Sequence, residues 1–249
     1  MVIEINSSYI LKYLTDIFEV GIVLTMLSDK DNKFIIYRIL RFIGKPVMKI
    51  MYRPTITGKE NIPEKGRVII AGNHKHALDP ILVDISTDRI VRTLAKKELH
   101  DGPFGFMFRS TGTIPVDLHS PKNHSAFESA LEVLNNDGVI NVSPEAKRNY
   151  TDELLLPFKY GAAAMSDRTG APVVPYSITG EYRLFRKSIR ITFGKPFVPD
   201  SSGGLYYANK EIYETVLSLL KENTSEEILK NKTITSFDEW EVKNNAKTS

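Results

Sequence analysis

The chain has 249 residues, a formal net charge of +3 and no cysteine. The lack of cysteine excludes disulfides, thiolate metal sites and a thiol nucleophile, and it suits a reducing compartment. The small net charge gives no argument for nucleic-acid binding, and an apolar content of 42% is enough for one α/β core with an appendage.

The first 52 residues are expected to form two amphipathic helices. Apolar side chains recur at helical spacing over residues 8–27, and a second helix is expected over about 33–52. Seven basic and no acidic residues lie between Lys33 and Lys59. Four of them follow steps of three and four residues and so share one helix face: Arg38, Arg41, Lys45 and Lys49. Pro46 is expected to kink this helix.

The N-terminal segment predicts a protein that lies on a membrane surface. No signal peptide is expected, because the first residues are not basic, and Val20 to Leu27 is far shorter than the roughly 18–20 residues of a membrane span. A basic amphipathic helix suits an anionic membrane surface. The alternative is a helix that packs on the core and keeps its basic residues in water. We favour the membrane because the apolar arc is wide.

After Gly58 strand-like and helical runs alternate. The expected strands are 67–72, 90–96, 113–117, 138–143, 172–178 and 189–194, and the expected helices are 80–86, 103–110, 122–136, 158–169 and 206–222. This alternation predicts an α/β fold with a mainly parallel central sheet flanked by helices. We therefore expect a two-helix element over 1–52, an α/β domain over 53–223 and a polar, irregular tail over 224–249.

The segment from Gly72 to Pro80 has the clearest chemical pattern. His74 and Asp79 stand five positions apart, directly after the apolar run Val68-Ile69-Ile70-Ala71. In open α/β sheets the loops that follow the strands bind ligands. A histidine oriented by a carboxylate can take a proton from a hydroxyl, so His74 is a candidate general base. The spacing alone is weak, since a loop histidine is more often structural.

Three further segments carry weaker signals. Gly112-Thr113-Ile114-Pro115-Val116-Asp117 reads as a strand, and His119, Lys122 and His124 follow it. In Ser143-Pro144-Glu145-Ala146-Lys147-Arg148, Glu145 is suited to bind a hydroxyl and Arg148 to bind phosphate oxygens, although such a loop is more often a solvated turn. Ala171-Pro172-Val173-Val174-Pro175-Tyr176 reads as a buried strand that forms a wall.

These four segments, in this order, resemble the glycerolipid acyltransferase superfamily, and in particular its bacterial 1-acyl-sn-glycerol-3-phosphate acyltransferases. The blocks of that family are Asn-His-x4-Asp, a Gly-x-Ile-Pro-Val-Asp-Arg-like block, Phe-Pro-Glu-Gly-Thr-Arg and a Val-Pro-Ile-Val-Pro-like block. The match runs from about Arg67 to Tyr176, and Lys97-Glu98-Leu99 and the segment from Pro157 to Ala162 resemble family spacers. Four ordered blocks are far more specific than one.

The resemblance implies transfer of a fatty acyl group from an acyl thioester, of acyl-carrier protein or coenzyme A, to the free hydroxyl of lysophosphatidate, giving phosphatidate in phospholipid biosynthesis. It implies His74 and Asp79 as the catalytic pair, Glu145 and Arg148 as acceptor-binding residues, and no metal and no cofactor beyond the thioester co-substrate. The family has an N-terminal two-helix docking element, which residues 8–52 resemble. The expected location is therefore the cytoplasmic face of the cell membrane, as a peripheral protein.

Two departures from the family pattern bear on the acceptor. Leu118 replaces the basic residue that usually ends the second block, and Ala146-Lys147 replaces Gly-Thr in the third, where Ser143 also replaces Phe. Lys147, Lys122 or His119 are candidates to restore the missing positive charge. The alternatives are acylation of a different lysolipid or hydroxylated or amine-bearing lipid, or a catalytically silent lipid-binding module.

Overall fold

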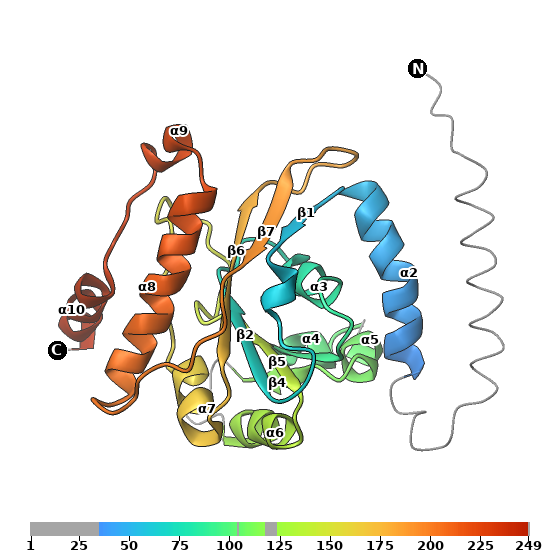
Figure 1. Ribbon diagram of the computed structural model, residues 1–249, viewed down its shortest axis with the longest axis horizontal. Coiled ribbons are helices and arrows are strands. Elements are labelled where there is room, and N and C mark those ends of the chain that lie inside the picture. The colour runs from blue at the N-terminus through green and yellow to red at the C-terminus, as the bar shows by residue number, and fades with distance from the viewer. Residues whose placement is uncertain (1–34, 104, 118–123, 249) are drawn as a thin grey trace.

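The computed structural model describes residues 35–103, 105–117 and 124–248. Within them a seven-stranded, mostly parallel sheet lies between two layers of helices (Figure 1). The α/β fold predicted from the alternating runs is therefore confirmed. The first predicted helix, over residues 8–27, lies outside the described residues. Among the helices that are described, none has the combination of length and apolarity that crossing a membrane requires.

Five strands of the sheet share one direction. The strands are β1 (Thr55–Thr57), β2 (Val68–Gly72), β3 (Val91–Lys96), β4 (Ile114–Val116), β5 (Val139–Val142), β6 (Val173–Gly180) and β7 (Ile189–Phe193), in the order β1-β7-β6-β2-β5-β3-β4. Strand β7 is antiparallel to β6. Every other neighbouring pair, including β1 with β7, is parallel. All residues of β2 and β5 are buried, because helices cover both faces of the sheet.

The two helical layers pack on alternate side chains of the strands. One layer consists of α6 (His124–Asn135), α7 (Gly161–Thr169), α8 (Leu205–Asn223) and α10 (Phe237–Thr248), and the other of α2 (Ile35–Met51) and α3 (Asp79–Asp84). In β2, Ile69 and Ala71 pack with the first layer, and Val68 and Ile70 pack with the second. Four short elements complete the fold: η2 (Lys59–Asn61), α4 (Lys97–Asp101), α5 (Gly105–Ser110) and α9 (Glu226–Leu229).

Helix α2 departs from its predicted role in one respect. It continues through Pro46 to Met51, and its basic residues are not all free for an external surface. The Arg41 guanidinium donates to the carbonyls of Arg89 (2.7 Å) and Asp84 (2.9 Å), and Lys45 Nζ lies 3.1 Å from Asp88 Oδ1. The prediction of one exposed basic stripe is therefore wrong for these two side chains, because the helix packs on the domain through them.

The C-terminal segment is not the irregular tail expected from its polar composition. Helices α9 and α10 form within it, and Phe237 at the start of α10 is fully buried. The Trp240 indole donates to the Tyr213 hydroxyl at 3.1 Å, and the Phe237 and Tyr213 ring centroids lie 5.5 Å apart. Two aromatic side chains thus anchor a mostly polar segment to α8.

Candidate active site

The topology of the sheet places its binding edge between β2 and β5. The connection after β2 passes through α3 to β3 on one side, whereas the connection after β5 passes through α7 to β6 on the other. Because the two adjacent strands send their chains in opposite directions, a crevice is expected outside their carboxyl ends. His74 follows β2 and Glu145 follows β5, so both lie at this edge.

Gly72 and Asn73 explain how the chain leaves the sheet to present His74. A Cβ at Gly72 would stand 2.3 Å from the Tyr176 carbonyl oxygen and 2.5 Å from its ring, so no larger residue fits. The buried Asn73 side chain then accepts from the Ile178 amide (2.7 Å) and donates to the Ile178 carbonyl (3.0 Å). Asn73 thereby continues the pairing with β6 through its side chain, and the main chain is free to turn.

The Asp79 carboxylate organises the loop that follows. It is fully buried at the start of α3, where Pro80 favours the first helical turn. Its Oδ2 accepts from the amides of Lys75 and His76, both at 2.7 Å, and lies 3.0 Å from His74 Nδ1. The predicted pairing of His74 with Asp79 is therefore present in the structure.

This contact determines which nitrogen of His74 is available for chemistry. An ionised carboxylate only accepts hydrogen bonds, so Nδ1 must carry the proton that it shares with Asp79. In neutral imidazole Nε2 is then the unprotonated nitrogen, which is the one that accepts a proton. The His74 side chain is 20% exposed, whereas that of Asp79 is 0% exposed. The carboxylate end of the pair is therefore buried, whereas the imidazole is partly exposed.

Glu145 holds the main chain of His74. One of its carboxylate oxygens accepts from the His74 amide at 2.6 Å and the other from the Leu156 amide at 2.9 Å. The Asn149 amide donates to the His74 carbonyl at 2.8 Å. The loop after β5 therefore binds both the amide and the carbonyl of His74. Burial raises the pKa of Glu145 to about 8, against the opposing effect of its two backbone donors. Because both oxygens are occupied, the contacts favour a positioning role, and acceptor binding by Glu145 stays a prediction.

The remaining predicted site residues are less closely placed. Lys147 and Arg148 are exposed in the loop that contains Glu145, and the Arg148 guanidinium lies 5.3 Å from the Tyr150 ring centroid. Lys122, with Leu118 and His119, lies outside the described residues. The structure therefore brings His74, Asp79 and Glu145 together, and binding of an acceptor by Lys147, Arg148 or Lys122 stays a prediction.

Sequence reasoning missed two contacts between this loop and the segment around the end of β6. The Tyr182 hydroxyl donates to Asp79 Oδ1 at 2.7 Å, and Lys75 Nζ donates to the Gly180 carbonyl. Tyr182 is 103 residues from Asp79 in the chain, and no spacing rule connects two residues that far apart. The usable signal is that Tyr182 closely follows β6, whose carboxyl end lies at the same edge as that of β2.

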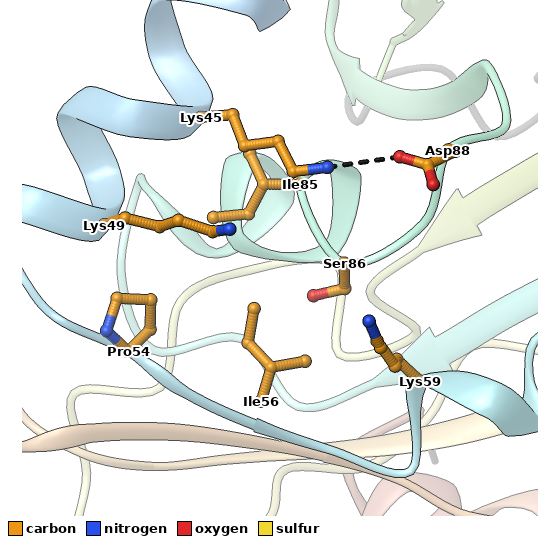
Figure 2. Close-up of a pocket in the computed structure, with 8 residues that line it drawn as sticks. All are labelled: Lys45, Lys49, Pro54, Ile56, Lys59, Ile85, Ser86 and Asp88. Atoms are coloured by element: carbon orange, nitrogen blue, oxygen red, sulfur yellow. Dashed lines mark hydrogen bonds and ion pairs between the residues drawn. The ribbon is translucent and has the colours of Figure 1, made fainter. Parts of the chain in front are cut away.

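Two surface cavities lie beside α2. One, with a volume of about 310 Å³, is lined by Lys45, Lys49, Pro54, Ile56, Lys59, Ile85, Ser86 and Asp88 (Figure 2). The other, of about 440 Å³, includes Tyr37, Arg38 and Phe42. Because β1 runs opposite to β2, Lys59 follows β1 at the edge where β2 begins. The first cavity therefore lies at the far edge of the sheet from His74.

A family model described as Acyltransferase matches residues 53–179. That range contains β1 to β6 except the last residue of β6, and it includes His74, Asp79 and Glu145. It ends before Tyr182 and begins after α2. The match covers about half of the chain.

Several curated proteins and one solved structure are similar to the chain. The 1-acyl-sn-glycerol-3-phosphate acyltransferase of Borreliella burgdorferi is 33% identical over 141 residues, which cover 56% of this chain and 56% of that protein. The protein of the same name from Saccharomyces cerevisiae is 32% identical over 150 residues, covering 55% and 47% respectively. The match therefore spans about half the length of these relatives. The crystal structure of the 1-acyl-sn-glycerophosphate acyltransferase PlsC from Thermotoga maritima superposes with a TM-score of 0.60 at 22% identity, covering 82% of this chain and 88% of that one, and shows the shared fold.

Proposed function

Because the chain belongs to the Acyltransferase family, we propose that it transfers a fatty acyl group from a thioester to the free hydroxyl of lysophosphatidate. The observation that carries the proposal is the 3.0 Å contact between His74 Nδ1 and Asp79 Oδ2 at the carboxyl edge of the sheet. This contact leaves His74 Nε2 as a base beside the crevice. The named activity of the relatives supports lysophosphatidate as the acceptor.

In the proposed reaction, the acceptor hydroxyl donates a hydrogen bond to His74 Nε2. Its oxygen attacks the thioester carbonyl carbon while the proton moves to Nε2, and Asp79 stabilises the imidazolium that forms. The tetrahedral intermediate then collapses, the carbon–sulfur bond breaks, and the imidazolium returns its proton to the leaving thiolate. The products are the new ester and a free thiol. General-base assistance of this kind contributes about 10²- to 10⁴-fold to the rate.

We also propose that the enzyme docks on a membrane through α2. Four of its apolar side chains remain between 43% and 62% exposed and are spaced seven, four and three residues apart, on one helix face: Ile36, Ile43, Val47 and Ile50. In the cavity of Figure 2, Asp88 pairs with Lys45, while Lys49 and Lys59 contribute two further positive charges. An apolar helix face beside a cationic hollow suits an anionic lipid surface.

The function is tested with the purified full chain, lysophosphatidate and each of the two thioester donors. The wild-type protein should form phosphatidate and free thiol, and His74→Ala should lose the reaction by at least about 10²-fold. His124→Ala is the matched control, because His124 is an exposed histidine at the start of α6. Equal rates for His74→Ala and His124→Ala would exclude His74 as the base.

Membrane docking is tested separately by sedimentation with anionic vesicles. Ile43→Asp with Ile50→Asp should weaken binding, whereas Val242→Asp, at an exposed valine on α10, should not. Binding that is insensitive to the α2 changes would contradict the docking proposal and leave the acyl transfer untouched.

The acceptor is the part of the proposal on which the chain departs from its family. Ala146 and Lys147 occupy positions that are Gly and Thr in the family block, and Ala146 has a left-handed backbone with φ of 57°. A screen of lysophosphatidate against other lysolipids and an amine-bearing lipid decides the matter. Rejection of lysophosphatidate with acylation of another lipid would assign the second candidate function, which uses the same pair, His74 and Asp79.

A further inference from the structure

A tyrosine beyond the matched family region contacts the buried carboxylate of the site. Tyr182 lies in the connection between β6 and β7, two residues after β6 ends at Gly180. Its hydroxyl stands 2.7 Å from Asp79 Oδ1, the oxygen that neither His74 nor the loop amides use. The hydroxyl must be the donor, because an ionised carboxylate only accepts.

The Tyr182 ring is held in place by two aromatic neighbours. It stacks on the His76 ring, with centroids 4.4 Å apart and planes inclined by 27°, and it meets the Tyr52 ring edge-on at 5.5 Å. Lys75 Nζ donates to the Gly180 carbonyl and so joins the same two segments at a second point. The loop from His74 to Asp79 is therefore joined at two points to the end of β6 and the connection that follows it.

With Tyr182 included, both oxygens of the Asp79 carboxylate accept hydrogen bonds. Oδ2 receives two amides and the His74 ring, and Oδ1 receives the phenol. Asp79 is fully buried, so removal of the phenol would leave Oδ1 without water to replace it. The carboxylate would then rotate or draw other groups toward Oδ1, and its alignment with His74 would loosen.

We propose that Tyr182 is a positioning residue for acyl transfer, which fixes Asp79 so that Oδ2 stays directed at His74 Nδ1. This inference rests on the proposed function. Burial beside Asp79 raises the pKa of Tyr182, which keeps the phenol protonated and able to donate.

The direction of the effect on the pH profile follows from the alignment of Asp79 with His74. Without the phenol, the turned carboxylate stabilises the imidazolium form of His74 less, so the base becomes free at a lower pH. The titratable groups that face Tyr182 are Asp79 on α3, His76 in the loop, Tyr176 on β6 and Tyr52 after α2. Tyr182→Phe retains all four and keeps the stacked ring, so the change isolates the hydroxyl.

Tyr182→Phe is the direct test, with Tyr37→Phe as the matched control. The Tyr37 hydroxyl donates to Asp84 at the opposite end of α3, so this control also removes a phenol-to-carboxylate bond from the same helix. For Tyr182→Phe we expect kcat to fall about tenfold with little change in KM, and the acidic limb of the pH–rate profile to move to lower pH. The low-field proton resonance of the His74–Asp79 hydrogen bond should move upfield, because the loosened alignment weakens that bond. For Tyr37→Phe we expect the profile and the resonance of the wild type.

Three results would overturn the inference. One is a Tyr182→Phe protein with the kcat, pH profile and proton resonance of the wild type. Another is an equal fall in kcat for both variants with no movement of either pH profile, which would indicate general destabilisation. If Tyr182→Phe does not fold, His76→Ala takes its place, because it removes the stacking partner and keeps the hydroxyl. The third overturning result is an unchanged proton resonance in His76→Ala. If the wild type acylates no lipid, the proposed function fails, while the resonance still tests Tyr182.

Discussion

Helix α3 has an aspartate at each end, and the two differ in what their partners leave open. Asp79 begins the helix and Asp84 ends it. Each carboxylate accepts a tyrosine hydroxyl, from Tyr182 at Asp79 and from Tyr37 at Asp84. Each also faces a nitrogen-bearing side chain, His74 Nδ1 at 3.0 Å and Arg41 Nε at 3.8 Å. A carboxylate, a phenol and a nitrogen-bearing side chain therefore meet in both regions, which have different roles.

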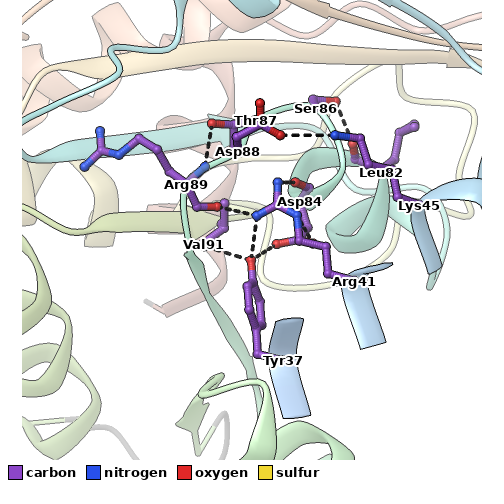
Figure 3. A network of polar contacts seen from close by, with 10 residues as sticks. All are labelled: Tyr37, Arg41, Lys45, Leu82, Asp84, Ser86, Thr87, Asp88, Arg89 and Val91. Carbon is purple, nitrogen blue, oxygen red and sulfur yellow. Dashed lines mark hydrogen bonds and ion pairs between the residues drawn. The ribbon is translucent and has the colours of Figure 1, made fainter. Parts of the chain in front are cut away.

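The region around Asp84, which we call the α2 seam (Tyr37, Arg41 and Asp84), is closed on itself. Arg41 donates to the carbonyls of Asp84 and Arg89, and the Val91 amide donates to the Tyr37 hydroxyl at 3.2 Å (Figure 3). In the site around Asp79, by contrast, only Nδ1 of the His74 ring has a hydrogen-bond partner among the described residues. A saturated network fixes α2 to the sheet, whereas an unsaturated one is available for chemistry.

Asp79→Asn should give the largest effect, because it removes the charge that pairs with His74. Asparagine has one accepting oxygen where aspartate has two, so the hydrogen bond from His74 forms in only one orientation of the amide. Asparagine also carries no charge, so the imidazolium loses its counter-charge. We expect kcat to fall by about 10²- to 10⁴-fold, measured as thiol release with the preferred acceptor. Asp88→Asn, at an exposed aspartate after α3, is the control and should retain activity. A small loss for Asp79→Asn would mean that the buried carboxylate is structural, like Asp84.

Glu145 and Asp84 both have a raised pKa, and pH-dependent stability should separate the two regions. Burial raises the pKa of Glu145 from 4.5 to about 8, and burial also raises that of Asp84. A carboxyl with a raised pKa holds its proton longer in the folded state, so its stabilisation is complete below its unfolded pKa and is lost as pH rises through the folded value. For Glu145 that window runs from about pH 4.5 to 8.

The measurement is the free energy of unfolding in denaturant across this range of pH. We expect the wild type to lose on the order of 2 kcal/mol between pH 5 and pH 8 through Glu145. Glu145→Gln should remove most of this slope and leave the smaller part due to Asp84. Identical slopes for the two proteins would show that the Glu145 carboxyl is ionised throughout the range in the folded state.

Arg41→Met tests the seam by removing its cation while keeping an apolar stem of similar length. Two carbonyls lose their donor and Asp84 loses its ion pair, so we expect a loss of about 1–2 kcal/mol in the free energy of unfolding. The rate of acyl transfer should stay within about twofold of the wild type. Arg38→Met, on the exposed face of the same helix, is the control. A fall in rate as large as that of Asp79→Asn would show that the seam controls the catalytic pair.

Sequence patterns predicted the central strands well and the peripheral elements poorly. β2 and β5 are continuous apolar runs, which buried parallel strands require, so composition alone placed them. β1 has three residues and was not predicted, because so short a run shows no periodicity. Phe237 and Trp240 fix α10, but two aromatic residues in a polar segment do not change its average composition.

The site was predictable where its residues are neighbours in the chain and not where they meet through folding. His74 and Asp79 stand five positions apart beside a buried strand, and the structure pairs them. Tyr182 is brought to Asp79 only by the pairing of β2 with β6. Helical spacing likewise indicated that Arg41 and Lys45 share a face, but it did not indicate that Asp84 and Asp88 lie opposite that face.

Ala146→Gly should give the smallest effect, and it tests whether backbone strain beside Glu145 matters for activity. Ala146 has φ of 57°, a left-handed conformation that costs a residue with a Cβ about 1–2 kcal/mol. Glycine avoids that cost and loses about 0.5–1 kcal/mol through its greater freedom in the unfolded chain. The net gain should be about 0.5–1 kcal/mol in the free energy of unfolding, measured in denaturant. Ala164→Gly, inside α7, is the opposite control and should destabilise by about 1 kcal/mol.

The rate of acyl transfer should not change in Ala146→Gly. The amide of residue 146 donates to the Ser143 carbonyl at 3.0 Å, and glycine keeps that amide, so the turn that holds Glu145 should persist. A gain in stability accompanied by a fall in rate would instead show that strain beside Glu145 contributes to the placement of His74.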